Sequence, residues 1–224
     1  MIRLYPVKTF NIFKSIFNKW IWSFNTDKKE IYLTFDDGPI PEITPWVLKR
    51  LENYKAKATF FCIGDNIFKN PDEFNQIIEK GHRVGNHTYN HLKGWNTNTV
   101  DYIENTLRAE KFFPYQQQKL FRPPYGKITN KQSKEILKLN YTIVMWDVLS
   151  GDFDQNISNE QCLANVTKHA ENGSIVVFHD SLKSQEKLQY VLPKVLKHYA
   201  ALGYSFCQLN DKEETVEKRL LKIA

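Results

Sequence analysis

Two adjacent aspartates, Asp36 and Asp37, are the residues of this sequence with the clearest potential for chemistry. They follow the apolar run 31–35, which predicts a buried strand, and Gly38-Pro39 ends that strand abruptly. Two neighbouring carboxylates at a strand end repel each other, so the fold must provide a cation, a proton or full solvation. The other candidate residues favour the cation.

Two histidines spaced four residues apart, His87 and His91, could act as ligands for that cation. On one helical turn their side chains would face the same way. Two imidazoles and one carboxylate leave a coordination position for water, which is typical of catalytic zinc. The same set also fits a ferrous oxygenase, and an isolated pair with this spacing is more often two solvated surface histidines.

A proline-rich segment at residues 121–126 could present an arginine in a fixed position. Its two prolines hold the neighbouring backbone extended, and Arg122 stands directly before them. An ordinary strand-exit loop with a surface arginine is the alternative interpretation.

A third histidine, His179, follows the apolar run 175–178. Its unperturbed pKa of about 6.5 suits a general acid near neutral pH, although a structural hydrogen bond would also explain a histidine at this place. The segment 146–153 adds an aromatic side chain and two carboxylates, Asp147 and Asp152. Either carboxylate could orient the imidazole.

The elements that must position these residues alternate along the chain. Apolar runs predict strands at residues 31–35, 58–63, 82–86, 120–122, 141–146, 174–178 and 204–207. Helices are predicted at residues 43–51, 71–80, 97–113, 131–139, 159–170 and 188–202. Such alternation implies parallel strands that are joined by right-handed crossovers.

Every unusual polar residue lies at the carboxyl end of a predicted strand. In a closed β/α barrel these ends surround one rim, whereas in an open sheet the first and sixth strands would lie far apart. Convergence on one site therefore predicts an α/β fold, a deformed (β/α)7-8 barrel in a single domain.

The composition fits one globular domain. The chain has 224 residues, of which 42% are hydrophobic and 25% are charged. Its formal net charge is +6, but the lysines are scattered and no nucleic-acid-binding motif is present. No nucleic-acid partner is therefore expected. The three cysteines lie far apart and imply no disulfide framework.

Residues 1–24 form an aromatic and basic segment. Polar residues interrupt it too often for a transmembrane helix, which needs roughly 20 mostly apolar residues, and no clear cleavable signal peptide is visible. The spacing of Phe10, Phe13, residues 16–17 and residues 20–21 favours an amphipathic helix. We expect this helix to pack on the barrel, with membrane-surface contact as the alternative.

The order of these motifs resembles that of the NodB-homology polysaccharide deacetylases, carbohydrate esterase family 4. The family motifs are matched in order by residues 34–39, 87–91, 122–126, 146–153 and 177–180. The resemblance covers roughly residues 30–210 and implies a deformed barrel. We therefore divide the chain into an N-terminal segment, residues 1–27, and a polysaccharide deacetylase domain, residues 28–224.

The resemblance also assigns roles to the matching residues. Asp36 would be the general base, and Arg122 would orient it. His179 would be the general acid, and Asp152 would be the carboxylate that tunes this acid. The metal ligands would be Asp37, His87 and His91. The backbone N–H of Tyr125 would bind the oxyanion. Trp146 would form a wall of the groove, and Val177 would line the acetyl pocket. Supporting residues would be Thr88 and Asp180.

One position departs from the family pattern. Where members often have Asp-Trp, this chain has Asp152-Phe153, which keeps an apolar face but lacks the indole N–H. The resemblance gives no role to Asp147.

The resemblance implies a metal-dependent hydrolase that removes acetyl groups from N-acetylated amino sugars of a polysaccharide, either peptidoglycan or a chitin-like chain. Zn²⁺ is the expected cofactor, and Co²⁺, Ni²⁺ or Fe²⁺ could occupy such a site. The alternatives are an O-acetyl esterase on acetylated xylan and a non-catalytic glycan-binding protein that retains the barrel. We expect an acetylated glycan as the partner, a monomer, and a location outside the cytoplasm or in the cell envelope.

Overall fold

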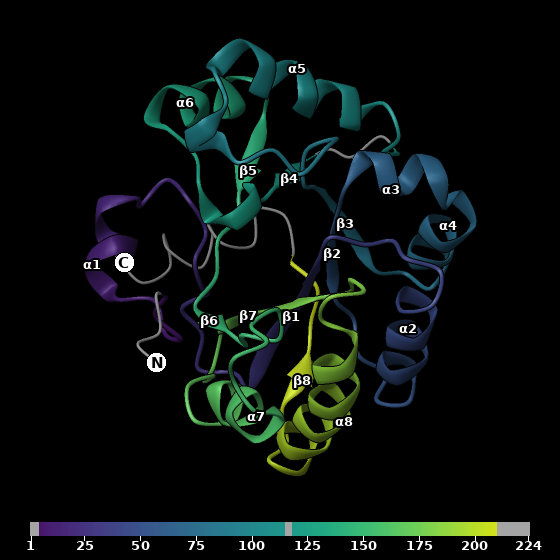
Figure 1. The fold of residues 1–224 in the computed structure, drawn as a ribbon. Coiled ribbons are helices and arrows are strands. Elements are labelled where there is room, and N and C mark those ends of the chain that lie inside the picture. The colour runs from purple at the N-terminus through teal and green to yellow at the C-terminus, as the bar shows by residue number, and fades with distance from the viewer. Residues whose placement is uncertain (1–4, 115–117, 210–224) are drawn as a thin grey trace.

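The computed structural model describes residues 5–114 and 118–209, and its centre is a curled parallel sheet with helices around the outside (Figure 1). The strands are β1 Glu30–Asp36, β2 Thr59–Cys62, β3 Arg83–Asn86, β4 Lys119–Phe121, β5 Tyr141–Ile143, β6 Val148–Leu149, β7 Ile175–His179 and β8 Ser205–Phe206. Their order in the sheet is β5-β4-β3-β2-β1-β7-β6, with β8 paired to β1 beside this path. Each of these pairs is parallel.

The helices follow the strands as the alternation predicts. They are α1 Asn11–Ile16, α2 Thr44–Glu52, α3 Gly64–Lys69, α4 Pro71–Glu79, α5 Thr99–Glu110, α6 Asn130–Lys138, α7 Asn159–Thr167 and α8 Gln185–Ala201. The predicted α/β architecture, a deformed barrel, is confirmed.

Some element boundaries differ from the predicted ones. The sequence did not predict α3 or the two-residue strand β6, because both are too short to produce a periodic pattern. The strand predicted at 141–146 ends at Ile143, because the residues that follow lead directly into β6.

The central strand β1 explains why the catalytic candidates are held rigidly. Residues 31–36 of this strand are all buried, as expected for a parallel strand that is covered on both faces. The ring of Phe35 stacks on Phe60 of β2 and on Phe178 of β7, with centroid separations of 5.0 and 5.9 Å. This core fixes β1 and β7, whose last residues are Asp36 and His179.

The N-terminal segment lies against the two outer strands of the order, β5 and β6. Ile21 pairs with Val144 just after β5, and Lys8 pairs with Val148 in β6. We call residues 5–24 the N-terminal strap. Its helix α1 has no buried residue, which differs from the predicted inward-facing helix, because the backbone on either side of α1 makes the contacts with the sheet. Among the described residues, no helix combines the length and apolar character needed to cross a membrane.

Candidate active site

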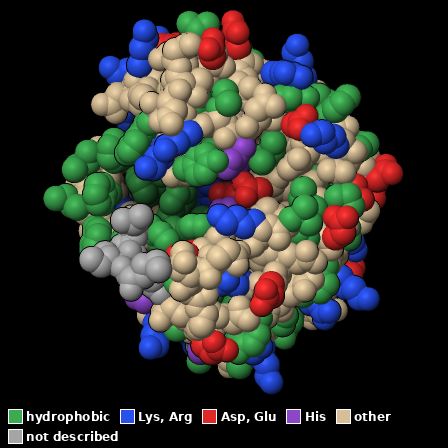
Figure 2. Space-filling model, viewed as in Figure 1, with side chains coloured by type: hydrophobic (Ala, Val, Ile, Leu, Met, Phe, Trp, Pro, Cys, Tyr) green, Lys and Arg blue, Asp and Glu red, His purple; other side chains and the backbone are tan. Residues whose placement is uncertain are grey.

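The predicted site residues meet at the carboxyl ends of the strands. Asp36 ends β1 and is paired in register with His179, which ends β7. His87 follows β3, and Arg122 follows β4. Figure 2 shows acidic and histidine side chains together near the middle of this face, beside a hollow bordered by hydrophobic side chains.

Asp37, His87 and His91 form a cluster with the composition and spacing of a metal site. One ligand atom from each residue lies within 4.8 Å of the other two. Asp37 Oδ1 is 3.2 Å from His91 Nε2 and 3.7 Å from His87 Nε2. The other ring nitrogen of His87, Nδ1, lies 2.8 Å from the backbone oxygen of Arg122, which leaves Nε2 for a metal.

The cluster passes a simple test of whether a divalent cation would fit. Asp37 Oδ1 is buried and, although His91 Nε2 lies 3.2 Å away, it forms no hydrogen bond with any of the described residues. A buried carboxylate oxygen without a donor is costly. A cation that is bound by this carboxylate and the two imidazoles would remove that cost, and the ligand set is one that zinc accepts.

The protonation states of two of these residues also suit metal binding. Burial lowers the pKa of His87 to about 4, so its ring is neutral at neutral pH. Burial alone would raise the pKa of Asp37, but His91 and the charge of His179 outweigh burial and hold that pKa well below its usual value. Neutral imidazoles and ionised carboxylates are the forms that coordinate metals.

The segment with the two histidines is a loop rather than the predicted helical turn. Thr88 and His91 have positive φ angles of 63° and 56°, which a right-handed helix does not allow. Asn86 at the end of β3 supports this loop, because its Oδ1 accepts a hydrogen bond from the Thr88 N–H at 2.8 Å. Thr88 Oγ1 accepts from the Leu92 N–H at 3.1 Å. The two imidazoles still converge, with centroids 5.0 Å apart.

The predicted base, Asp36, forms a buried ion pair with Arg122 beside the cluster. Arg122 Nη1 donates to Asp36 Oδ1 at 2.7 Å, and the two residues are 0% and 3% exposed. Nη1 also donates to Thr34 Oγ1 at 2.7 Å, and Nη2 donates to the Met145 oxygen at 2.9 Å. Loss of either partner would leave an unpaired buried charge. The orientation of the Asp36 carboxylate is therefore fixed.

The predicted acid, His179, is held by Asp152. His179 Nδ1 lies 2.8 Å from Asp152 Oδ1, and the His179 backbone N–H donates to Oδ2 at 2.7 Å. Burial lowers the pKa of this imidazole, but the carboxylate outweighs burial, and the pKa is raised to about 9. The ring is thus protonated at neutral pH, as proton donation requires.

Asp180 supports the strand end that carries the two aspartates. Its Oδ1 accepts from the Gly38 N–H at 3.1 Å, and its Oδ2 accepts from Thr44 Oγ1 at 2.6 Å. Gly38 is needed here because a Cβ would lie 2.0 Å from the Asp180 carboxylate. Burial raises the pKa of Asp180 to about 8.

The residues predicted to contact the substrate lie around this centre. Tyr125 has a positive φ of 59°, and its side chain is exposed. Trp146 is half-buried and packs against Gly126, where a Cβ would come within 2.6 Å of the indole. Val177 is buried within β7.

Several supporting residues were not predicted from the sequence. Thr34 is a small polar residue within the mostly apolar strand β1, and Asn86 is the last residue of β3; a polar residue within or directly after an apolar run is the signal that could have indicated them. Asp147, one of the two carboxylates that the sequence offered as a partner for His179, does not take that place: it is buried and pairs with Lys8 and Lys14 of the N-terminal strap, at 2.7 and 2.6 Å.

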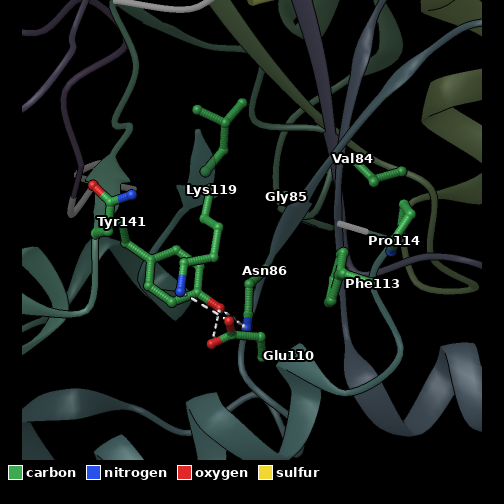
Figure 3. A pocket seen from close by; sticks show the side chains of 10 residues that line it. Val84, Gly85, Asn86, Glu110, Phe113, Pro114, Lys119 and Tyr141 are labelled. Atoms are coloured by element: carbon green, nitrogen blue, oxygen red, sulfur yellow. Dashed lines mark hydrogen bonds and ion pairs between the residues drawn. The ribbon is translucent and has the colours of Figure 1, made fainter. Parts of the chain in front are cut away.

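A cavity of about 300 Å³ lies apart from this centre, and none of the predicted site residues lines it (Figure 3). One of its walls is a chain of polar contacts. Lys119 Nζ donates to Glu110 Oε1 at 2.8 Å, and the Tyr141 hydroxyl donates to Glu110 Oε2 at 3.1 Å. Asn86 Nδ2 then donates to the Tyr141 hydroxyl at 3.0 Å. This row of polar contacts ends at Asn86, the residue directly before His87.

This arrangement can support hydrolysis. A metal-binding cluster, an ionised carboxylate held by Arg122 and a protonated imidazole held by Asp152 lie at neighbouring strand ends. Such a set can activate a water molecule, accept its proton and donate a proton to a leaving group.

Comparisons with known proteins give matches over most of the chain. A family model described as polysaccharide deacetylase matches residues 24–144. A peptidoglycan-N-acetylglucosamine deacetylase of Bacillus cereus is 36% identical over 193 residues, which cover 85% of this chain and 91% of that protein. The peptidoglycan-N-acetylmuramic acid deacetylase PdaA of Bacillus subtilis is 31% identical over 204 residues, which cover 88% of this chain and 76% of that protein.

The fold is also similar to a solved structure. The Bc1960 peptidoglycan N-acetylglucosamine deacetylase superposes with a TM-score of 0.81 at 31% sequence identity. The match covers 88% of this chain and 94% of that one.

Proposed function

The chain belongs to the polysaccharide deacetylase family, and on this basis we propose that it is a metal-dependent enzyme that hydrolyses the N-acetyl groups of amino sugars in peptidoglycan. The observation that carries the proposal is the convergence of the Asp37, His87 and His91 cluster with two further pairs, Asp36–Arg122 and Asp152–His179. The names of the relatives, which are peptidoglycan deacetylases, support the choice of polymer.

We assign the metal to Asp37, His87 and His91. Zn²⁺ suits two imidazoles and a carboxylate, and Co²⁺, Ni²⁺ or Fe²⁺ would accept the same ligands. When bound, such a cation supplies Lewis acidity, which polarises a carbonyl and lowers the pKa of water.

The base and the acid of the proposed reaction are Asp36 and His179. Asp36, fixed by Arg122, accepts a proton from the attacking water as the water oxygen bonds to the acetyl carbonyl carbon. The C–N bond then breaks, and the departing nitrogen keeps the electron pair and takes a proton from His179. The products are acetate and a free amino sugar. Asp152 serves this step because it keeps the imidazole protonated and oriented.

The remaining predicted residues shape the site around the acetyl group. The Tyr125 backbone N–H would stabilise the negative charge on the carbonyl oxygen. Trp146 would form one wall for the sugar, and Val177 would line the acetyl pocket. Thr88 and Asp180 would keep the metal-binding segments in place through the hydrogen bonds described above.

We further propose that the protein acts outside the cytoplasm or in the cell envelope, because the relatives are named for a cell-wall polymer. A monomer is sufficient, since one chain supplies every group that the reaction uses. Contact of residues 1–24 with a membrane surface stays a prediction, which the exposed side chains of Phe10, Ile12 and Ile16 would suit.

Acetate release from a panel of glycans tests the proposal. The purified protein should release acetate from N-acetylated peptidoglycan fragments, a chelator should abolish the release, and added Zn²⁺ should restore it. Chitin oligomers and acetylated xylan complete the panel. Release from acetylated xylan alone would contradict N-deacetylation and indicate an O-acetyl esterase. A metal-loaded protein that binds these glycans without releasing acetate would indicate a non-catalytic role.

A further inference from the structure

The N-terminal strap contacts the segment 146–154 at several points. The Thr9 backbone N–H donates to the Asp147 oxygen at 2.8 Å, and Thr9 Oγ1 donates to the Trp146 oxygen at 2.8 Å. This segment also carries the carboxylate that orients the predicted general acid. The strap is therefore packed against the part of the chain that places the acid.

The strap is fastened by a buried charge cluster. Asp147 has only 2% of its side chain exposed, and its carboxylate contacts Lys8 Nζ at 2.7 Å and Lys14 Nζ at 2.6 Å. Both lysines belong to the strap. Separation of the strap from the barrel would leave this buried carboxylate without its cations, which is strongly unfavourable. The strap is thus a fixed part of the folded structure.

At its start, the strap reaches the surroundings of the predicted acid. The Tyr5 hydroxyl donates to Asp154 Oδ2 at 2.8 Å, and the Tyr5 ring packs on Phe153 with a centroid separation of 5.3 Å. The Phe153 ring in turn meets the His179 imidazole edge-on at 5.2 Å. Three rings from distant parts of the chain therefore form a continuous row that ends at the acid.

The imidazole of His179 has two kinds of support. Asp152 fixes its Nδ1, and Phe153 contacts the ring itself. The backbone around Phe153 is tied by the hydrogen bond from Tyr5 to Asp154, and its ring is backed by the Tyr5 ring. Without Tyr5, Phe153 could leave the imidazole, because it would lose a ring that packs against it.

We propose that Tyr5 is a positioning residue for the general acid His179, and that it acts through Phe153 and Asp154. This inference rests on the proposed function. Tyr5 does not contact the reacting atoms; it fixes the place from which the proton is donated. Displacement of a reacting group by about 1 Å can reduce the rate by up to about 100-fold, so the loss of this support should slow the chemical step more than it weakens substrate binding.

The test compares Tyr5→Ala and Tyr5→Phe with matched changes at Tyr190. Tyr190 also donates a hydrogen bond to a carboxylate, Glu160 Oε1 at 3.0 Å, but it does so between α8 and α7. Tyr5→Ala should lower kcat about tenfold, with KM and zinc content unchanged. Tyr5→Phe, which retains the ring contact with Phe153 but loses the hydrogen bond to Asp154, should recover part of this loss. Tyr190→Ala should leave kcat, measured per folded molecule, at the wild-type value.

Two kinetic results would overturn the inference. One is a wild-type kcat per folded molecule in Tyr5→Ala, and the other is an equal loss in Tyr190→Ala. If the wild-type protein releases no acetate at all, the proposed function fails instead. The placement of the acid is then tested by the NMR signals of the His179 ring, which Tyr5→Ala should shift and Tyr190→Ala should not. Unchanged His179 signals in Tyr5→Ala would contradict the inference directly.

Discussion

The candidate site has a metal side, formed by Asp37, His87 and His91, and an acid side, formed by Asp152 and His179. The residues that support the two sides differ in how far they lie from them in the sequence. On the metal side, the Thr88 N–H donates to Asn86 and the Leu92 N–H donates to Thr88, within a few residues, and His87 Nδ1 lies against the Arg122 oxygen, 35 residues away. On the acid side, the segment beside His179 is fastened to the N-terminal strap, and Lys14 reaches Asp147 across 133 residues of sequence.

This difference predicts different responses to substitution. Changes on the metal side should remove or weaken the bound cation, because that side consists of ligands and of the bonds that orient them. Changes on the acid side should slow the reaction while the cation stays bound. Measurements of metal content and rate on the same variants therefore separate the two sides.

The largest effect is expected on the metal side, for His91→Ala. This change removes one of three ligands, so metal affinity should fall by more than the roughly 10–100-fold that is typical when a residue merely supporting a ligand is lost. Acetate release should fall to background. Metal content after dialysis and the rate of acetate release measure the two outcomes.

The matched control for this change is His198→Ala, which removes an exposed histidine on α8. It should keep both metal and activity. A His91→Ala protein with full metal content and full activity would show that the cluster is not the catalytic metal site.

A smaller loss, of about 10²–10⁴-fold in kcat, is expected for His179→Ala. The general acid would be missing, but the three ligands would be intact, so metal content should match the wild type. If His179→Ala instead lost its metal and kept the wild-type kcat, His179 would be a metal ligand and not the general acid.

The pH dependence of kcat sharpens the assignment of the acid. Burial lowers the pKa of His179, but Asp152 outweighs burial and raises it to about 9. The proton is available below this pH, so kcat should fall as pH rises through about 9. In Asp152→Asn the carboxylate is gone and burial stays, so the fall should begin at a lower pH. If kcat falls at the same alkaline pH in the wild type and in Asp152→Asn, His179 is excluded as the acid.

The sequence allowed the fold and the outline of the site to be predicted, because both depend on local patterns. Apolar runs with a polar residue at the end placed Asp36, His87 and His179 at strand ends, and parallel topology brings such ends together. The resemblance to polysaccharide deacetylases is confirmed by the family match. The roles assigned to individual residues stay predictions.

The supports that are distant in sequence could not be predicted in this way. The helical turn predicted for the two histidines was wrong: Thr88 and His91 have positive φ angles, and the Thr88 N–H donates to the Asn86 side chain, neither of which follows from residue spacing. No local pattern indicates that the Asp147 carboxylate is neutralised by two lysines near the N-terminus. That pairing exists only in the folded chain.

The smallest expected effect lies on the metal side, for Tyr141→Phe. Its hydroxyl links Asn86 to Glu110 along the cavity wall in Figure 3, and the change removes only that oxygen. Asn86 Nδ2 keeps its bond to the Thr106 oxygen at 3.0 Å, so the loop with the histidines should loosen rather than collapse. A net hydrogen bond contributes about 1 kcal/mol, and zinc affinity should therefore fall by about fivefold at most.

Competition with a chelator of known affinity measures this change, and kcat at saturating zinc should stay near the wild-type value. Tyr190→Phe, which removes a comparable hydroxyl far from the loop, should leave zinc affinity unchanged. A lower kcat at saturating zinc, with unchanged affinity, would mean that the Asn86 chain acts on the acid side after all. The contrast between ligands supported by residues within about 55 positions and an acid supported from more than 130 positions away would then fail.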